Sequence, residues 1–212
     1  LPAYYPLSER DLAVSGVRLL ELSGYLSRQG ETAPVLPGMQ GAYDSMKADY
    51  IAAPTLMPRS VKGTLTSHRE IDALVFEAPE PTHRAFVFLH GYGGNWTLPC
   101  WIAARAAAQR NMMTICPTLD FDARWWEGKG PALVEQLMND LKHQGYKDFV
   151  LGGISNGSVG ASALAPKYRA NLDALVLISG VASACEPTKV PTLILHGKDD
   201  GMADILNARP YA

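Results

Sequence analysis

The sequence predicts an α/β protein whose core is a mostly parallel sheet with helices on both faces. From residue 59 onward, short apolar runs of strand length alternate with helical segments, an order typical of parallel strands joined by crossover helices. The run Arg84–Leu89 is apolar after its first residue, as expected for a strand that is buried on both faces. With 212 residues, 47% of them apolar, the chain is long enough to bury a full core.

The segment 1–58 differs in pattern from the rest of the chain. It predicts an N-terminal helical segment packed on a core formed by residues 59–212. The alternative is a lid or wall over a catalytic mouth, and periodicity alone does not separate these two roles.

Two helices are expected in this first segment. Ser8 followed by Asp11 is typical of a helix start, because serine caps the first turn and an acid three residues later completes the cap. Apolar residues then follow a helical stripe over 12–26, and Gly30 is a plausible stop. A second, weaker helix is expected at 42–52.

The remaining chain predicts strands and helices in alternation. Apolar or β-branched runs predict strands at 61–67 and 71–77, which form a hairpin, and at 84–89, 112–116, 147–152, 172–178 and 192–195. Helical patterns predict helices at 99–110, 131–144 and 156–168. Binding and catalytic sites of such sheets form at the carboxyl ends of the strands.

Composition excludes several classes of function. The formal charge is −2 and charged residues make up 19%, so no basic face is expected to bind nucleic acid. The longest apolar runs have strand length and are too short to span a membrane. The protein is expected to be soluble, either cytoplasmic or exported after removal of a leader, because the chain starts at Leu1.

The three cysteines, Cys100, Cys116 and Cys185, are widely spaced and match no zinc pattern. Buried free thiols are expected, with one disulfide and a leftover thiol as the alternative. No phosphate-binding loop and no dinucleotide fingerprint is present in the sequence, so neither a metal nor a cofactor is predicted.

One motif carries most of the chemical information. Residues 153–157, Gly-Ile-Ser-Asn-Gly, stand between the expected strand 147–152 and the expected helix that follows. In that setting the serine sits on a sharp strand-to-helix turn that exposes its hydroxyl. The flanking glycines let strand and helix approach closely.

Two further motifs follow strands in the same chain. Residues 89–95 are Leu-His-Gly-Tyr-Gly-Gly-Asn, and residues 195–200 are Leu-His-Gly-Lys-Asp-Asp. Together with the serine turn, in this order and each at a strand end, they resemble the α/β-hydrolase family. The resemblance runs from about Arg59 to the end of the chain.

The resemblance implies roles for individual residues. Ser155 would be the nucleophile, and Asp200 would be the acid that orients the base, with Asp199 as the neighbour that could be confused with it. The backbone N–H groups of Tyr92 and Asn156 would form the oxyanion hole, which stabilises the charge that develops on the attacked carbonyl.

The base is the missing part of this pattern. The family order is serine, acid, histidine, and no histidine follows Asp200 in this chain. None of the histidines is a natural substitute; they are His68, His83, His90, His143 and His196. We therefore expect a truncated piece of a longer hydrolase, incomplete at its C-terminus, or else a genuine short variant without a working triad.

Substrate contacts are expected around the same mouth. The short connection after Gly180 leaves no room for a cap domain behind the sixth strand. Aromatic side chains around a cleft commonly bind apolar acyl groups, with ordinary packing under a loop as the alternative. The residues predicted to contact substrate are Gly91, Gly93, Trp96, Trp125 and Trp126.

The resulting expectation is a serine carboxylesterase-type hydrolase that cleaves carboxylic esters or thioesters through an acyl-enzyme on Ser155. An acyltransferase or a peptidase on the same fold is an alternative, because a fold does not fix a function. A non-catalytic binding protein that lacks the base is another. The expected partner is a small-molecule ester or thioester, and the oligomeric state is left open.

Overall fold

A computed structural model describes residues 8–28, 35–49, 71–183 and 188–211. The chain divides into two compact units. One contains residues 1–58 together with Trp96–Leu98, and the other contains residues 59–95 and 99–212.

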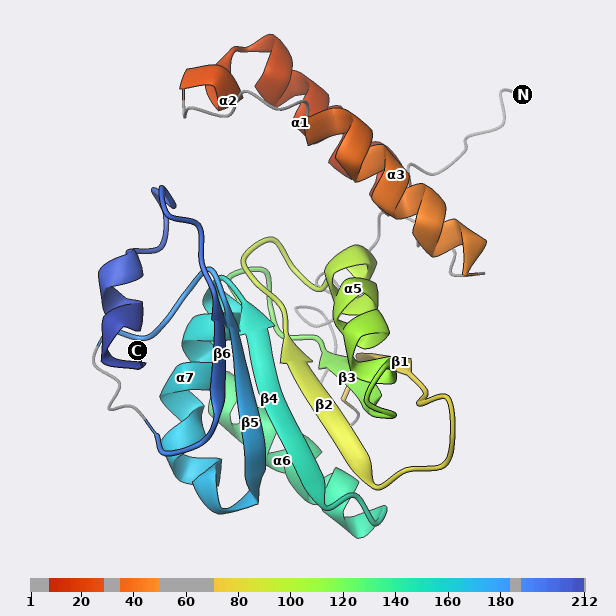
Figure 1. The fold of residues 1–212 in the computed structure, drawn as a ribbon, viewed down its shortest axis with the longest axis vertical. Coiled ribbons are helices and arrows are strands. Elements are labelled where there is room, and N and C mark those ends of the chain that lie inside the picture. The colour runs from red at the N-terminus through yellow and green to blue at the C-terminus, as the bar shows by residue number, and fades with distance from the viewer. Residues whose placement is uncertain (1–7, 29–34, 50–70, 184–187, 212) are drawn as a thin grey trace. The chain divides into compact units, whose positions relative to one another are not determined.

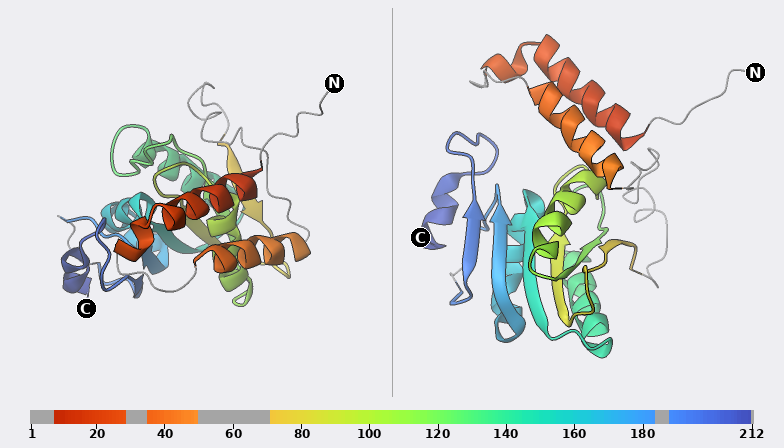
Figure 2. Two further views of the ribbon diagram at one scale, coloured as in Figure 1. Left: turned by 90° about the horizontal axis from the view of Figure 1, so that it is seen from above. Right: turned by 45° about the vertical axis from the view of Figure 1, so that its right-hand side comes forward.

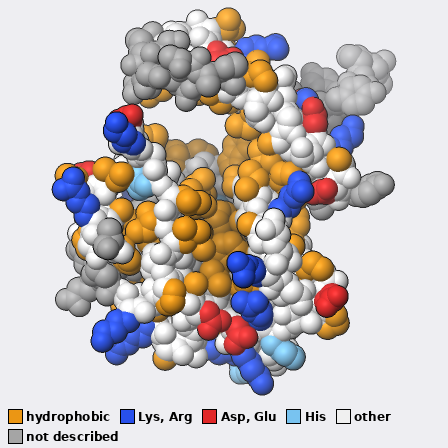
Figure 3. Space-filling view, viewed as in Figure 1, with side chains coloured by type: hydrophobic (Ala, Val, Ile, Leu, Met, Phe, Trp, Pro, Cys, Tyr) orange, Lys and Arg blue, Asp and Glu red, His pale blue; other side chains and the backbone are white. Residues whose placement is uncertain are grey.

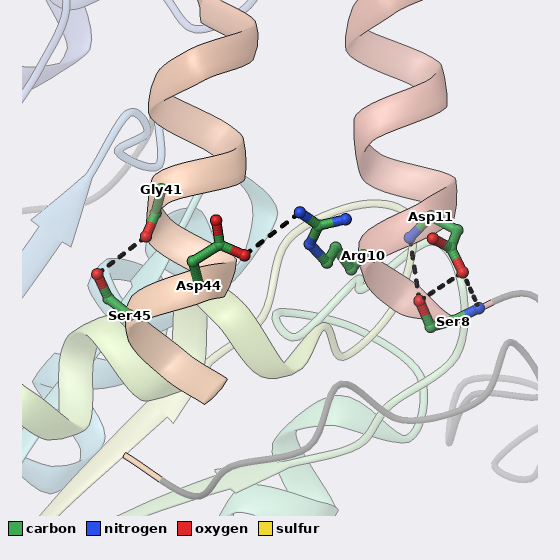
Figure 4. Close-up of polar contacts among 6 residues, drawn as sticks. All are labelled: Ser8, Arg10, Asp11, Gly41, Asp44 and Ser45. Atoms are coloured by element: carbon green, nitrogen blue, oxygen red, sulfur yellow. Dashed lines mark hydrogen bonds and ion pairs between the residues drawn. The ribbon is translucent and has the colours of Figure 1, made fainter. Parts of the chain in front are cut away.

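The first unit is built on two helices, α1 (Glu9–Leu22) and α3 (Val35–Ala48), with the short helix α2 (Tyr25–Arg28) between them. The predicted capping box is present, because the Ser8 hydroxyl accepts from the Asp11 N–H and the Asp11 carboxylate accepts from the Ser8 N–H. Figure 4 shows this cap together with the ion pair that joins the two helices, Arg10 to Asp44 at 3.3 Å.

The predicted helix bounds in this unit differ from the observed ones. The stripe expected to continue through 12–26 is interrupted after Leu22, where Gly24 has a φ of 66° that a helix cannot accommodate. The expected stop at Gly30 lies outside the described residues. Helix α3 begins at Val35 rather than at residue 42, with Pro37 tolerated in its first turn.

Glu9 is the buried polar centre of the first unit. Its carboxylate accepts hydrogen bonds from the Tyr43 hydroxyl at 2.9 Å and from the N–H groups of Thr97 and Leu98 at 2.7 and 3.0 Å. Burial and the nearby Glu9 charge raise the pKa of Tyr43 well above its ordinary value. The phenol therefore stays a hydrogen-bond donor at any physiological pH.

The second unit contains a six-stranded sheet in the order β1-β3-β2-β4-β5-β6, drawn in Figure 1. The strands are β1 (Ala73–Phe76), β2 (Arg84–Leu89), β3 (Met113–Pro117), β4 (Asp148–Ile154), β5 (Leu172–Ile178) and β6 (Thr192–Leu195). All neighbours run parallel except β1 and β3, which pair antiparallel. The predicted mostly parallel sheet is confirmed. The hairpin partner expected at 61–67 lies outside the described residues.

Helices cover the sheet from both sides (Figures 1 and 2). Helices α6 (Gly130–His143) and α7 (Asn156–Tyr168) lie on one face, and α5 (Thr97–Ala108) lies on the other. Alternation along β2 explains the two cores, because successive side chains of a strand point to opposite faces. Ala85, Val87 and Leu89 join the core under α6 and α7, whereas Phe86 and Phe88 join the core under α5.

The expectation that all three thiols are free is wrong. Cys100 on α5 and Cys116 on β3 form a disulfide with a Cα–Cα distance of 6.2 Å. Both cysteines are buried in the core under α5. The alternative prediction, one disulfide with a leftover thiol, agrees with the structure for the bond between Cys100 and Cys116. The third cysteine, Cys185, lies outside the described residues.

Two 3₁₀ segments complete the described fold. A 3₁₀ turn, η1 (Arg169–Asn171), follows α7, and a longer one, η2 (Ile205–Tyr211), follows β6 without having been predicted. Hydrophobic side chains gather over the sheet in the view of Figure 3. Leu193 and Leu195 of β6 are half exposed. Among the described residues, every helix is too short or too polar to cross a membrane.

Candidate active site

Ser155 occupies a strained turn between β4 and α7. Its backbone has a φ of 53° and a ψ of −122°, a region that costs a non-glycine residue about 1–3 kcal/mol. The surrounding structure holds this conformation, because the Ser155 N–H donates to Ile178 O at 2.8 Å and Ser155 O accepts from Val159 N at 3.0 Å. The side chain is therefore presented at the carboxyl end of the sheet.

The glycines of the motif are needed for close packing. A Cβ on Gly157 would collide with the backbone oxygen of Leu89, and a Cβ on Gly153 would collide with the backbone of Gly157 itself. Gly91 is similarly confined, since its Cβ would lie 3.1 Å from the Cβ of Ser155. The loop after β2 thus runs directly against the serine turn, which agrees with the glycine role expected from the sequence.

A cavity of about 600 Å³ opens at this end of the sheet. Of the residues predicted for catalysis, it brings together Ser155, Asp200, Tyr92 and Asn156. Its other lining residues are largely apolar and come from β4, α7 and the loops after β5 and β6. They are Ile154, Val159, Ser179, Gly180, Val181, Met202, Ala203, Asp204 and Asn207. All of them belong to the second unit.

Asp200 is held as a carboxylate by its own loop. Its Oδ1 accepts from the N–H groups of Ala203 at 3.0 Å and Met202 at 2.9 Å. These bonds hold the pKa of Asp200 below its usual range, with smaller contributions from His196 and from the Ser179 hydroxyl. A charged carboxylate is the form that can orient and stabilise an imidazolium.

Ser179 is a cavity residue that sequence reasoning missed. It follows β5, has a φ of 49°, and donates its N–H to Leu195 O at 2.8 Å. Its only sequence signal was its position directly after a strand, where Ser155 also stands.

The two expected oxyanion donors lie on converging segments. Asn156 is the first residue of α7, so its N–H has no intrahelical acceptor and stands at the positive end of the helix dipole. Tyr92 precedes Gly93 and Gly94, whose φ angles of 95° and 100° turn the loop sharply. The Gly93 N–H donates to Phe121 O at 2.9 Å, which ties this loop to the one after β3.

His90 is buried in the loop after β2. Its Nε2 accepts from Leu119 N at 3.0 Å, which leaves Nδ1 as the protonated nitrogen, 2.8 Å from Gly91 O. Burial lowers the pKa of His90 to about 4, so the ring is neutral at neutral pH. Both ring nitrogens contact the loop backbone and His90 does not line the cavity, so its role is to fix the loop.

The other described histidines do not line the cavity either. His83 precedes β2, and Lys147 N donates to its backbone oxygen at 2.9 Å, at the amino ends of β2 and β4. His143 ends α6 on the way to the same edge. His196 follows β6 with its Nδ1 3.0 Å from Gly197 O, and His68 lies outside the described residues.

The three tryptophans predicted to contact substrate differ in their surroundings. Trp125 is 0% exposed, and its Nε1 donates to His90 O at 2.9 Å, so its ring supports the loop and does not reach a substrate. Trp126 is 37% exposed but does not line the cavity. Trp96 is half-buried and groups with the first unit. Phe121, another exposed ring of the same loop, packs on Tyr92.

Comparisons with known proteins give a structural likeness. A thermostable esterase matches with a TM-score of 0.56 at 17% identity, over 68% of this chain and 47% of that chain. Esterase PE8 matches with a TM-score of 0.53 at 19% identity, over 67% of this chain and 81% of that chain.

The chain spans about half the length of the thermostable esterase and of Est1E from Butyrivibrio proteoclasticus, 47% and 49% respectively. No protein-family model matches the sequence, and the search of curated proteins returns no match. The parallel sheet order, the serine turn after β4 and the likeness to the thermostable esterase and esterase PE8 agree on one conclusion. The chain has the α/β-hydrolase fold.

Proposed function

We propose that the protein is a serine hydrolase that cleaves carboxylic esters or thioesters through an acyl-enzyme on Ser155. The observation that carries the proposal is the positive φ of Ser155 at a strand-to-helix turn, in a cavity that Asp200 also lines. Strained serines persist only where the fold over-determines them, and such strain clusters at active sites.

In this proposal Ser155 Oγ attacks the carbonyl carbon and loses its proton to a base. The carbonyl oxygen becomes an oxyanion that accepts hydrogen bonds from the N–H groups of Asn156 and Tyr92. Collapse of the tetrahedral intermediate breaks the bond to the alcohol or thiol, which leaves with the proton returned by the base. Water then attacks the acyl-enzyme in the same way, releases the acid and restores the serine.

Asp200 has a positioning role in this scheme. Its carboxylate holds a histidine in the productive tautomer and stabilises the imidazolium. We assign the base to a histidine outside the described residues, because the described histidines do not line the cavity. The same observation supports a second candidate, a binding protein that keeps the fold and the cavity without turnover.

Hydrolysis kinetics separate the two candidates. We expect protein expressed from its complete coding sequence to hydrolyse p-nitrophenyl acetate, and Ser155→Ala to lower kcat/KM by at least about 1,000-fold. Ser183→Ala, which changes an exposed serine of the same unit, should keep the wild-type rate. If the wild-type protein shows no turnover, the binding candidate remains. If Ser155→Ala keeps full activity, another residue is the nucleophile.

A further inference from the structure

We propose that Tyr92 and Phe121 form a binding face for an uncharged aromatic ring, so that the site selects esters whose ring lies one or two bonds from the ester group. This inference rests on the proposed function of Ser155. It deepens that function by naming a substrate class and the two residues that recognise it.

Phe121 is not itself among the lining residues of the cavity, but its ring packs on that of Tyr92, which is. Their centroids are 4.8 Å apart and their planes meet at 73°. Tyr92 lines the cavity, and the two residues remain 62% and 51% exposed. The pair therefore leaves apolar surface exposed to water, and a flat apolar group of a ligand can bury that surface.

The loops that carry the two rings are tied together by hydrogen bonds. The Gly93 N–H donates to Phe121 O at 2.9 Å, which joins the backbones of the two loops. On the far side of Phe121, the Asn156 side chain donates to Asp122 O at 2.8 Å. Because these bonds hold the two loop backbones before a ligand arrives, little backbone entropy is lost when a third ring binds.

The position of Tyr92 sets where the substrate ring would lie. Its N–H is the proposed oxyanion donor, and the same residue lines the cavity. A ring bound to this face is therefore close to the reacting carbonyl. A ring attached through a long chain would reach past it.

The charge of the lining favours a neutral ring. The cavity is lined by two carboxylates, Asp200 and Asp204, and by no lysine, arginine or histidine among the described residues. A ring that carries its own carboxylate would meet repulsion without a compensating cation. The geometry therefore points to neutral aromatic esters.

The test compares substrates of equal size. The pairs are ethyl phenylacetate with ethyl cyclohexylacetate, and benzyl acetate with cyclohexylmethyl acetate, in which only the ring type changes. Aromatic contacts beyond area burial predict a kcat/KM ratio that favours the aromatic ester of at least one pair by about 2- to 10-fold. Phe121→Leu should remove most of this preference for the aromatic ester. Phe121→Tyr, which keeps a ring, should preserve the preference.

Trp126→Leu is the matched control, because it removes a partly exposed ring of the same loop that, unlike Phe121, is not packed on Tyr92. It should leave the ratio unchanged. An unchanged ratio in Phe121→Leu, or an equal fall in Trp126→Leu, would overturn the inference while leaving Ser155 chemistry intact.

A binding measurement keeps the two proposals distinct. In Ser155→Ala, phenylacetamide should bind more tightly than cyclohexylacetamide by calorimetry, and Phe121→Leu should remove the difference. If the wild type hydrolyses no ester but this difference is present, the proposed function fails and the ring-binding face stands. If hydrolysis is normal and the difference is absent from both readouts, the ring-binding face fails alone.

Discussion

The indole Nε1 of Trp125 donates a hydrogen bond to the backbone oxygen of His90 at 2.9 Å, and the two rings meet edge to face with centroids 5.1 Å apart. Both residues are buried. The contact joins the loop after β3 to the loop after β2, which carries the proposed oxyanion donor Tyr92. A buried tryptophan thus supports the loop that brings Tyr92 to the cavity.

Trp125→Phe is expected to destabilise the protein by about 2–3 kcal/mol, because it leaves the buried His90 oxygen without its donor and removes part of the packing. The measurement is the urea midpoint. Trp126→Phe, a change at a partly exposed position, should alter stability by no more than about 0.5 kcal/mol. Equal effects at the two positions would contradict the supporting role of Trp125.

His90 predicts a specific dependence of stability on pH. The pKa of His90 in the folded protein, about 4, lies below its ordinary value of 6.5. Between these two pH values the unfolded chain binds a proton at His90 that the folded protein does not bind. Stability from this group is complete above pH 6.5 and is lost as the pH falls toward 4, by up to about 3 kcal/mol.

The variant His90→Gln isolates this effect. Other titrating groups act equally in both proteins, so the difference in unfolding free energy between wild type and variant should shrink from pH 7 to pH 4.5. A difference that stays constant over that range would mean that His90 is not the neutral, buried ring described above.

Gly157→Ala tests the close approach at the serine turn. The added Cβ meets the backbone oxygen of Leu89, and backbone cannot move aside as a flexible side chain can. We expect a loss of about 3 kcal/mol or more in thermal or urea unfolding. Gly201→Ala, where nothing lies within 4 Å, should be nearly neutral.

Asp200→Asn tests the assignment of the acid. The amide keeps an oxygen for the Ala203 and Met202 N–H groups but loses the charge, so kcat/KM should fall by about 1,000- to 10,000-fold with little change in folding. Asp199→Asn, at the exposed neighbouring position, should retain at least half of the activity. Steady-state ester hydrolysis decides between them, and a reversed result would move the role to Asp199.

Much of the second unit could be predicted because its strands are continuous apolar runs. Arg84–Leu89, Leu172–Ile178 and Thr192–Leu195 appear with the expected bounds, as does the helix Asn156–Tyr168. In these segments local pattern and tertiary burial agree. The antiparallel pairing of β1 with β3 was not predicted, since a short strand does not reveal its partner.

Features that depend on distant contacts were missed. Nothing in the spacing of Cys100 and Cys116 shows that α5 brings them together over β3. Trp125 and Phe121 share one loop, yet only the fold decides that Trp125 turns into the core and Phe121 outward. Ser179 likewise gains its place in the cavity from the parallel alignment of β5 with β4.

Covalent labelling tests the central claim most directly. Protein from the complete coding sequence is treated with a fluorophosphonate probe, and peptide mass spectrometry locates the adduct. The account predicts a single adduct on Ser155 that is abolished by Ser155→Ala and retained by Ser183→Ala. An adduct on Ser179, the other serine at the cavity, or labelling that survives Ser155→Ala would contradict it.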